Sequence, residues 1–254
     1  MITISMVNIK GGVGKTTSVV NISSCLNRYH KKRVLIIDCD AQINATSYIL
    51  MEDIPQKTIR DIMKRAKAVD VIVDKKWTKT SLSIIPGDST IDLLSVNSID
   101  KLYEALQDVS DDYDFCLIDC PPHLSDICLS AIRASDYVLV PALPDTDSLG
   151  GYSLLIDAIT NIRNNTNNGS LEILGVFFNA VSKESLDQYI VDECRKGFGD
   201  SLFKATIRRS TVVKQCRYFG LPVCEKREKS EINNDYKLLT KQIVQRLKKW
   251  RKEA

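Results

Sequence analysis

Long apolar runs, paired cysteines and histidines are all scarce in this sequence of 254 residues. No apolar run approaches the roughly 18 residues of a membrane span. No basic region precedes the first apolar run, so we expect a cytoplasmic protein without a secretory signal. The 8 cysteines include no CxxC pair and fall mostly within apolar patterns, which favours structural packing over a disulfide framework. His30 and His123 are too isolated to indicate a metal site.

Positive charge is concentrated at the end of the chain. Residues 1–203 contain 20 Lys and Arg against 27 Asp and Glu, whereas residues 204–254 contain 15 against 5. The basic portion 204–254 therefore indicates a polyanionic partner, either nucleic acid or an anionic membrane surface. A basic helix that is merely solvated is the alternative.

The segment Ile9–Thr17, IKGGVGKTT, lies between an apolar run, Ile2–Val7, and a helical pattern. A strand that leads through a glycine-rich turn into a helix points several backbone N–H groups, and the positive end of the helix dipole, at one place. Such a place binds phosphate, and glycines let the chain close around it. The residues expected to bind a nucleotide here are Gly11, Gly12, Val13, Gly14, Lys15, Thr16 and Thr17. A glycine-rich turn that binds nothing is the alternative.

Two side chains of this loop have expected roles with a nucleoside triphosphate. Lys15 reaches the terminal phosphates, and the Thr16 hydroxyl ligates the accompanying Mg²⁺. The pattern GxxxxGK(S/T) is not met in full, because Ile9 stands where its first glycine belongs. Lys10 instead precedes the paired glycines, so the loop carries two lysines. A dinucleotide-binding GxGxxG motif is excluded, since Thr17 occupies the place of the third glycine.

Strand and helix patterns alternate along the rest of the chain. Short apolar runs at 33–38, 81–86, 114–119, 137–140 and 171–178 predict strands, and helical patterns occur at 57–69, 98–109, 149–162, 184–196, 210–219 and 232–252. Ser98 and Ser210 are expected helix caps, Gly220 a helix stop and Pro141 a strand end.

This alternation predicts an α/β fold. We expect a single-domain P-loop NTPase over residues 1–254, with a mostly parallel twisted sheet and helices on both faces. Right-handed crossovers then bring the carboxyl ends of the strands to one edge of the sheet, where ligands bind.

Three acids stand at the ends of predicted strands: Asp38 and Asp40 after the second strand, and Asp119 at the end of the fourth. A triphosphate with Mg²⁺ requires a carboxylate near the metal and a group that orients the attacking water. An apolar run that ends in an acid, as at Asp119, is typical of a Walker B strand, whose carboxylate reaches the metal directly or through water. An aspartate that caps a helix is the alternative for any one of them.

The loop resembles that of the ParA/MinD family of ATPases, whose deviant signature KGGxGK(S/T)(S/T) is met in full by residues 10–17. DCDAQINAT at 38–46 resembles the family's DxDPQxN segment, with Ala41 in place of proline and Ile43 at a position that is often glycine. DCPP at 119–122 matches the family's DxPP switch. The likeness covers essentially the whole chain and is strongest to the short ParA/Soj-type partitioning ATPases.

The resemblance implies roles for the acids. Asp40 would orient the hydrolytic water, and Asp38 would support the network around phosphate and metal. VPALPDTDSLGG at 140–151 resembles the loop beside the family's second switch, and we assign no role to its Asp145 and Asp147. The expected catalytic residues are Lys10, Lys15 and Asp40, and the expected metal ligands are Thr16, Asp38 and Asp119.

The resemblance also implies how the nucleotide is held between two subunits and which residues contact its base. Lys10 would reach across a nucleotide-sandwich dimer to the partner's phosphates, where a cation offsets the charge that develops in phosphoryl transfer. Asn179 would contact adenine, and Pro222 lies in a segment that would close over the base. Iron–sulfur relatives of this class bridge a cluster between subunits with cysteines, which is a remote alternative role for the cysteines here.

By the same resemblance the expected function is DNA partitioning. The protein would be a Mg²⁺-dependent ATPase that forms a homodimer with ATP, binds DNA without sequence specificity and drives plasmid or chromosome partitioning at the nucleoid. A ParB-like centromere-binding partner would stimulate hydrolysis. Contacts to phosphates carry such binding, which weakens with salt. The expected DNA-binding residues are Lys204, Arg208, Arg209, Lys214 and Arg217.

A MinD-like positioning ATPase on the membrane is the alternative. The segment 236–252 has an apolar stripe among basic residues, as in helices that lie on anionic bilayers. The stripe consists of Tyr236, Leu239, Ile243, Leu247 and Trp250. A helix docked on a sheet shows the same stripe, so we expect core packing and no membrane binding. A metabolic P-loop enzyme would share the fold, but no substrate pocket is recognisable in the sequence.

Overall fold

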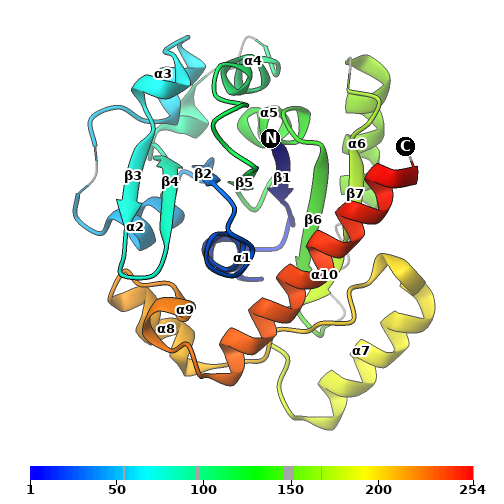
Figure 1. Cartoon of the computed structure of the whole chain (residues 1–254). Coiled ribbons are helices and arrows are strands. Elements are labelled where there is room, and N and C mark those ends of the chain that lie inside the picture. Colours follow the sequence, from blue (N-terminus) through cyan, green and yellow to red (C-terminus); the bar gives the residue numbers. More distant parts are fainter. Residues whose placement is uncertain (54, 95–97, 146–151, 167, 254) are drawn as a thin grey trace.

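A seven-stranded sheet forms the centre of the computed structural model, which describes residues 1–53, 55–94, 98–145, 152–166 and 168–253 (Figure 1). The strands are β1 (Ile2–Met6), β2 (Val34–Asp38), β3 (Val73–Lys76), β4 (Ser81–Ile85), β5 (Phe115–Asp119), β6 (Tyr137–Ala142) and β7 (Glu172–Phe178). Their order is β3-β4-β2-β5-β1-β6-β7. All pairs are parallel except the hairpin of β3 and β4, so the predicted mostly parallel sheet is confirmed.

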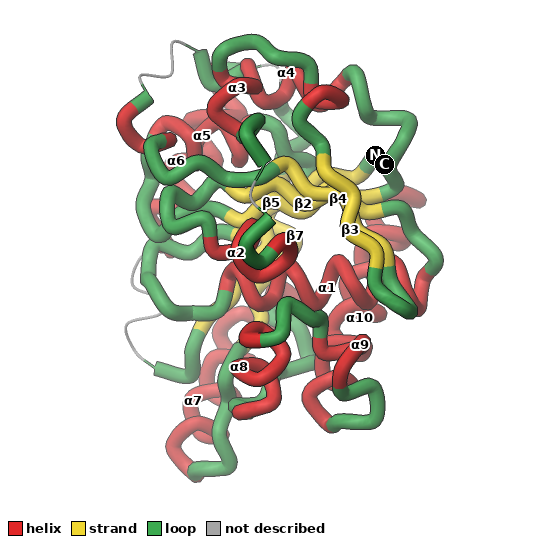
Figure 2. Tube along the Cα trace, turned by 90° about the vertical axis from the view of Figure 1, so that its left-hand side faces the viewer, coloured by secondary structure: helices red, strands yellow, loops and turns green. Residues whose placement is uncertain are grey.

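Helices cover both faces of the sheet, as predicted. The helices are α1 (Lys15–His30), α2 (Asn44–Leu50), α3 (Ile59–Met63), α4 (Lys101–Gln107), α5 (Asp126–Arg133), α6 (Tyr152–Asn165), α7 (Ser185–Phe198), α8 (Thr211–Tyr218), α9 (Val223–Lys226) and α10 (Glu231–Glu253). Short 3-10 turns, η1, η2 and η3, occupy Ala68–Asp70, Ile91–Leu93 and Gly199–Ser201. One core cluster joins the sheet to α3, α4, α5 and α6, and a second joins it to α1, α2, α8, α9 and α10 (Figure 2).

Strands β2 and β5 are buried along their whole length, because helices lie on both of their faces. Their register pairs Asp38 with Asp119, and Met6 of β1 also pairs with Asp119. The predicted meeting of the acid-bearing strand ends with the glycine-rich loop after β1 is therefore confirmed.

Some predicted boundaries were wrong. Strand β6 does not end before Pro141 but runs through it to Ala142. The Pro141 carbonyl accepts a hydrogen bond from the Asn8 side chain, so the proline nitrogen faces β1 as well, where the strand pairing has already ended at Leu139. No ladder donor is missing there, which is why a proline is tolerated.

Helix caps followed the predictions in part. The Ser210 hydroxyl accepts from the Val212 N–H and caps α8, and Gly220 stops that helix in a left-handed conformation, with φ of 61°. Ser98 is not the cap of α4, because the helix begins later, at Lys101. The pattern at 57–69 yields only the short α3 and the turn η1. Residues 149–151, the predicted start of α6, lie outside the described residues.

The apolar stripe of α10 faces the core. Tyr236, Leu239, Ile243 and Leu247 are at most 2% exposed, and Trp250 packs against Tyr137 with ring centroids 5.7 Å apart. This confirms the prediction of core packing for that stripe. Among the described residues, no helix is both long and apolar enough to cross a membrane. The cysteines are all free thiols, seven of them buried, as expected for packing residues.

Candidate nucleotide-binding site

The glycine-rich loop enters α1 through a left-handed turn. Gly14 precedes the helix with φ of 86°, and Gly12 has φ of 77°, conformations that L-residues with a side chain rarely adopt. Val13 between them is completely buried and anchors the loop, whereas Gly11 and Gly12 are exposed. The first backbone N–H groups of α1 have no acceptor within the helix, so the loop and the helix start together offer a phosphate site.

Lys15 is folded back onto this loop. Its ammonium group donates to the carbonyl oxygens of Asn8, at 2.9 Å, and Lys10, at 3.3 Å. Burial lowers the pKa of Lys15, and the carboxylate of Asp119 opposes that change. A buried cation whose hydrogen bonds go to carbonyl groups can exchange them for phosphate oxygens, which bear full negative charge.

Lys10, the second lysine of the loop, is held by its own chain. Its ammonium group lies 2.9 Å from the Asp145 carboxylate, which follows β6. Asn8 fixes the same region, because its amide oxygen accepts from the Lys10 N–H and its amide nitrogen donates to Pro141. Asp145 had no role in the sequence analysis, and Asp147, in the same loop, lies outside the described residues.

Asp119 is the unsatisfied acid of the site. It is completely buried, and neither carboxylate oxygen has a hydrogen-bond partner among the described residues. Burial raises its pKa, the Asp38 carboxylate adds to the rise, and the nearby Thr16 hydroxyl opposes it. A buried carboxylate without donors, beside a hydroxyl, fits a divalent cation well. The side chains of Thr16 and Asp119 therefore suit the Mg²⁺ of a bound nucleotide.

Asp38 is also completely buried, but its oxygens are occupied. One accepts from the backbone N–H and the hydroxyl of Thr46, at 2.8 and 2.7 Å, and the other accepts from the Asp40 N–H at 3.2 Å. Burial raises the pKa of Asp38 to about 6. The structure thus places Asp38 as a support for α2 and the Asp40 loop, and direct ligation of metal by Asp38 stays a prediction.

Asp40 lies in a tight turn that leads into α2. Its carboxylate accepts from the Gln42 N–H at 2.9 Å, and its carbonyl accepts from the Ile43 N–H at 2.8 Å. Ile43 has φ of 46°, an unusual conformation for a β-branched residue. The left-handed turn explains why glycine suits this position in the family. Ile43 therefore keeps this turn but has a strained backbone conformation there.

The Asn179 side chain touches the P-loop directly. Its amide donates to the Val13 carbonyl at 2.7 Å, and its oxygen accepts from the Ala180 N–H at 2.9 Å. The contact is so close that a Cβ at Gly14 would lie 2.0 Å from the amide nitrogen. Asn179 therefore stands at the same strand edge as the phosphate loop, where its predicted contact with adenine requires it.

No three His, Cys, Asp or Glu side chains in the described part of the chain form a metal cluster by themselves. The arrangement of loop, Lys15, Thr16 and Asp119 is that of a site for a nucleoside triphosphate.

Comparisons with known proteins support this assignment. A family model described as AAA domain matches residues 1–173. The sporulation initiation inhibitor protein Soj of Bacillus subtilis (strain 168) is 34% identical over 229 residues, 87% of this chain and 89% of that protein. The chromosome-partitioning ATPase Soj of Treponema pallidum (strain Nichols) is 30% identical over 251 residues, 96% of this chain and 97% of that protein. The chain belongs to the ParA/Soj family of ATPases.

The fold is also that of septum site-determining protein MinD from Pyrococcus horikoshii OT3, solved with Mg-ADP. The two chains superpose with a TM-score of 0.78 at 24% identity, over 95% of each. The family resemblance stated from the P-loop signature is thus confirmed, and the single α/β architecture with it.

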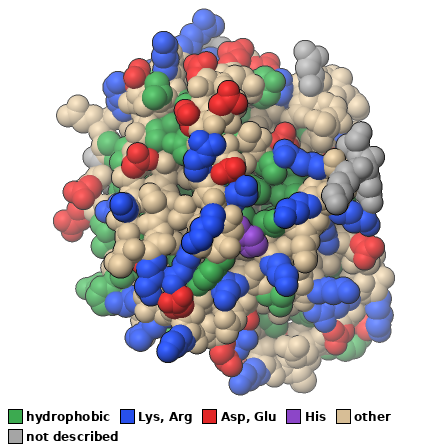
Figure 3. Space-filling view, in the orientation of Figure 1, with side chains coloured by type: hydrophobic (Ala, Val, Ile, Leu, Met, Phe, Trp, Pro, Cys, Tyr) green, Lys and Arg blue, Asp and Glu red, His purple; other side chains and the backbone are tan. Residues whose placement is uncertain are grey.

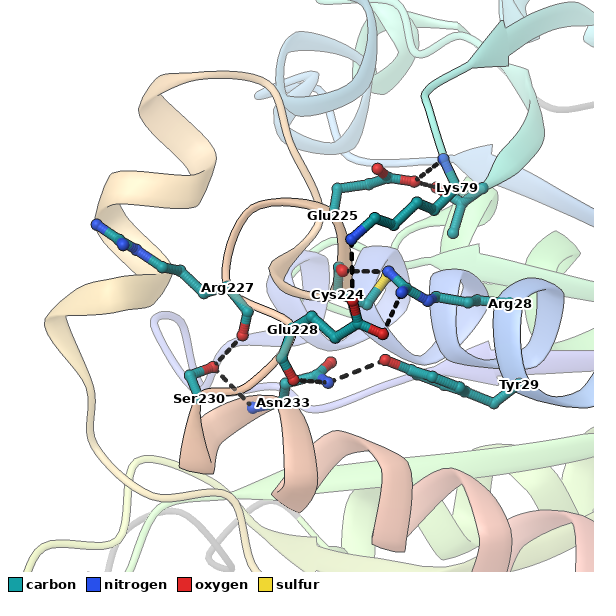
Figure 4. Close-up of polar contacts among 10 residues, drawn as sticks. Arg28, Tyr29, Lys79, Cys224, Glu225, Arg227, Glu228, Ser230 and Asn233 are labelled. Atoms are coloured by element: carbon teal, nitrogen blue, oxygen red, sulfur yellow. Dashed lines mark hydrogen bonds and ion pairs between the residues drawn. The ribbon is translucent and has the colours of Figure 1, made fainter.

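In this ParA/Soj-family chain, the segment expected to close over the base is firmly attached to α1. Pro222 is buried at the start of α9, and the Val223 N–H donates to the Asn21 side chain at 2.9 Å. Figure 4 shows Arg28 of α1 reaching the Cys224 carbonyl and the Glu228 carboxylate. The contact of Pro222 with adenine is untested and stays a prediction.

Two further polar contacts lie beside those between α1 and the α9 segment, residues 222–228. Lys79, from the β3–β4 turn, bonds Glu228 at 2.9 Å, and Asn233 donates to the Tyr29 hydroxyl at 3.0 Å (Figure 4). Polar contacts from α1, a hairpin turn and α10 therefore fix the α9 segment.

The predicted DNA-binding residues differ in their surroundings. Lys204, Arg209, Lys214 and Arg217 are exposed, and Arg217 also donates to the Asn44 side chain at 2.6 Å. Arg208 instead donates to Asp235 at 2.6 and 2.9 Å and to Glu231. The charge of Arg208 is therefore already compensated within the chain, which favours the other four as phosphate contacts. Lys and Arg side chains gather across the middle of the face that α10 crosses (Figure 3).

Sequence reasoning missed four side chains that organise the site: Asn8, Asn21, Thr46 and Asp145. Thr46 lies within the quoted segment at 38–46, where a hydroxyl 8 residues from Asp38 carried no signal of its own. Asn21 was recognisable as a polar residue on a buried helix, a pattern that indicates a specific hydrogen bond.

Proposed function

We propose that this chain is a Mg²⁺-dependent ATPase that dimerises around ATP, binds DNA without sequence specificity and drives plasmid or chromosome partitioning. The observation that carries the proposal is the two-lysine loop beside Asp119, a buried carboxylate that no described residue hydrogen-bonds. ATP and Mg²⁺ are the proposed ligands because loop, hydroxyl and carboxylate together match a metal-bound triphosphate. The Mg-ADP that the MinD structure contains supports the same choice.

Different residues would bind the phosphates, hold the metal and position the attacking water. The backbone of Gly11–Thr17 and the Lys15 ammonium group would bind the phosphates, and Thr16 and Asp119 would hold Mg²⁺. When bound, Mg²⁺ neutralises charge on the phosphate oxygens. Asp40 would orient the attacking water from its turn at the end of β2, a role in which a fixed carboxylate contributes through positioning.

Dimerisation would follow from Lys10. When Lys10 leaves Asp145, its ammonium group is free to reach the phosphates of a nucleotide in the partner subunit. Charge that develops on the transferred phosphoryl group would then be offset by a cation from each subunit. ATP thus favours the dimer, and hydrolysis would release it.

The basic portion 204–254 is the part of the chain that would bind DNA. In the ATP dimer, Lys204, Arg209, Lys214 and Arg217 would contact DNA phosphates, and a ParB-like centromere-binding protein would stimulate hydrolysis. The protein would then work in the cytoplasm on the nucleoid. Membrane binding through α10 is disfavoured, because the apolar stripe of that helix is buried.

The experiment uses the Asp40→Ala protein, expected to hold ATP without hydrolysing it. Binding to random-sequence DNA and to anionic liposomes is measured with ATP or ADP at two salt concentrations. ATP-dependent and salt-sensitive DNA binding without liposome binding is the expected result. Liposome binding without DNA binding would overturn the proposal in favour of a MinD-like positioning ATPase.

A further inference from the structure

A groove of about 720 Å³ lies on the surface away from the nucleotide site. It opens between the α7–η3 segment, the beginning of β7 and the second half of α10, which Figure 1 draws in yellow, green and red. Ile173 and Leu174, at the amino end of β7, line it, whereas the phosphate loop lies at the carboxyl ends of the strands. A ligand in the groove would therefore leave the nucleotide site accessible.

The floor of the groove is built around the guanidinium group of Arg246. It donates to the carbonyl oxygens of Leu174, at 2.7 Å, and Asp200, at 2.6 Å, and it stacks on the Phe203 ring, 3.9 Å from the centroid. These three contacts come from two segments, β7 and residues 200–203, and hold the group in one orientation. The side chain of Arg246 is thus a fixed part of the floor.

Strand β7 is shaped to admit this guanidinium group. Val138 of β6 pairs with Ile173 and Leu139 pairs with Gly175, so Leu174 is an extra residue that makes a bulge. Gly175 has φ of 148°, and a Cβ there would lie 2.3 Å from Arg246 Nη1. Only glycine, which has no Cβ, leaves the space that Arg246 occupies, so the position of the guanidinium group depends on glycine at position 175.

The charge of Arg246 is not balanced by a carboxylate. Among the described residues, none forms an ion pair with it, and its two acceptors are carbonyl groups that carry only partial charge. Arg195 and Lys204 add further positive charge to the walls, and both side chains are exposed. Asp200 is an acid that lines the groove, and Asp192 of α7 pairs with Arg195 at 2.9 Å, whereas Lys249 is a further cation of the lining. The groove retains an excess of positive charge.

Apolar surface lies beside these cations. Ile173 and Trp250 line the groove, and both side chains are only partly buried. We propose that the groove binds an acidic peptide segment of a partner protein, with a carboxylate on Arg246 and an aromatic or aliphatic side chain against Ile173 and Trp250. A guanidinium group whose plane is fixed suits a bidentate carboxylate.

A peptide fits these features better than duplex DNA does. A carboxylate on a flexible chain reaches the recessed Arg246, whereas the convex sugar–phosphate backbone of a duplex meets cations on a rim. The exposed parts of Ile173 and Trp250 likewise have a counterpart in an apolar peptide side chain and none in phosphate. Binding at this site needs neither nucleotide nor DNA, and it shares only Lys204 with the proposed DNA contacts.

The test measures fluorescence anisotropy of a labelled peptide, EDFEDLED, with the nucleotide-free full chain. Arg246→Gln is expected to weaken binding by about tenfold or more, because a charge-assisted pair is lost. Lys241→Gln is the matched control, an exposed lysine of the same helix that does not line the groove, and it should leave affinity unchanged. The peptide EDGEDGED, which lacks apolar side chains, should bind more weakly.

Two further arms keep the test decisive. If circular dichroism shows that Arg246→Gln is unfolded, the exposed pair Arg195→Gln and Lys204→Gln replaces it, with the same expected loss. The proposal is overturned if the charge-reversed peptide KKFKKLKK binds equally well, if Arg246→Gln binds like the wild type, or if a short random DNA duplex displaces EDFEDLED through the groove residues. Because binding is measured without ATP, its failure is distinguishable from failure of the ATPase proposal.

Discussion

The Lys10 ammonium group lies 2.9 Å from the Asp145 carboxylate, so the lysine that marks this loop is restrained within its own subunit. The two side chains are 32% and 38% exposed, and ion pairs of this kind contribute about 0.2–1 kcal/mol. A triphosphate carries more negative charge than one carboxylate and would therefore outcompete such a pair. The contact therefore holds Lys10 back from the phosphate loop without preventing its transfer to a nucleotide.

Lys10→Ala is expected to abolish ATP-dependent dimerisation while some nucleotide binding remains. Lys15 and the backbone of the loop still bind the phosphates, but the cation proposed to reach the second subunit is gone. Analytical ultracentrifugation with ATP measures the dimer, and a fluorescent nucleotide measures binding. An unaltered dimer would count against the assigned role of Lys10.

Asp145→Asn is expected to favour the ATP dimer modestly. Loss of an exposed ion pair of about 0.2–1 kcal/mol corresponds to up to about a fivefold lower ATP concentration at half-maximal dimerisation. Asp192→Asn, which removes an exposed ion pair with Arg195 on α7, serves as the matched control and should leave dimerisation unchanged. A weaker dimer in Asp145→Asn would show that Asp145 supports the loop instead of restraining Lys10.

Gly14→Ala is expected to be strongly destabilising, and Gly11→Ala is not. A Cβ at Gly14 would lie 2.0 Å from the Asn179 amide, and its φ of 86° is unfavourable for alanine. At Gly11 a Cβ would meet nothing within 4 Å. Urea denaturation should show a loss of at least about 2 kcal/mol for Gly14→Ala and less than about 1 kcal/mol for Gly11→Ala. Equal losses would mean that Asn179 moves aside without cost.

Stability without nucleotide and Mg²⁺ is expected to fall as pH rises from about 4 to about 6. Burial raises the pKa of Asp38 from 3.8 to about 6, so between these values the folded state binds more protons than the unfolded state. Stability then decreases with rising pH, here by an amount on the order of 1–3 kcal/mol. Asp38→Asn should flatten this slope.

Urea denaturation of both proteins between pH 4 and 7 measures the effect of Asp38. The buried Asp119 contributes with the same sign, because its pKa is also raised by burial, so a residual slope should persist in Asp38→Asn. The opposite result, a wild-type slope that Asp38→Asn leaves unchanged, would show that Asp38 does not titrate in this range.

Local patterns were sufficient for the fold class and for the centre of the site. The P-loop, the buried strands and their terminal acids are contiguous segments, so spacing and apolarity revealed them, and parallel topology implied that they meet. The elements missed were short or polar. Strand β3, VDKK, lies at an edge with its side chains alternately half-buried and exposed, and α2, α5 and α9 have at most eight residues.

Contacts between distant segments could not be predicted in this way. Asn8 lies 133 residues from Pro141, Lys10 lies 135 from Asp145, and Arg28 lies 200 from Glu228. None of these pairs has a local signature, because each side chain is ordinary in its own segment. The compensation of Arg208 by Asp235 likewise became visible only when α10 was placed beside the strand edge.

The order of residues alone established a phosphate loop with two lysines, three strand-end acids and a basic final portion, because backbone geometry and charge depend on neighbours in the chain. The tertiary structure decided which of these groups have hydrogen-bond or ion-pair partners. It left Asp119 buried without a hydrogen-bond donor among the described residues, paired Lys10 with Asp145, and placed Arg246 in the space beside Gly175. Burial and pairing depend on what the rest of the chain brings alongside, which no single segment encodes.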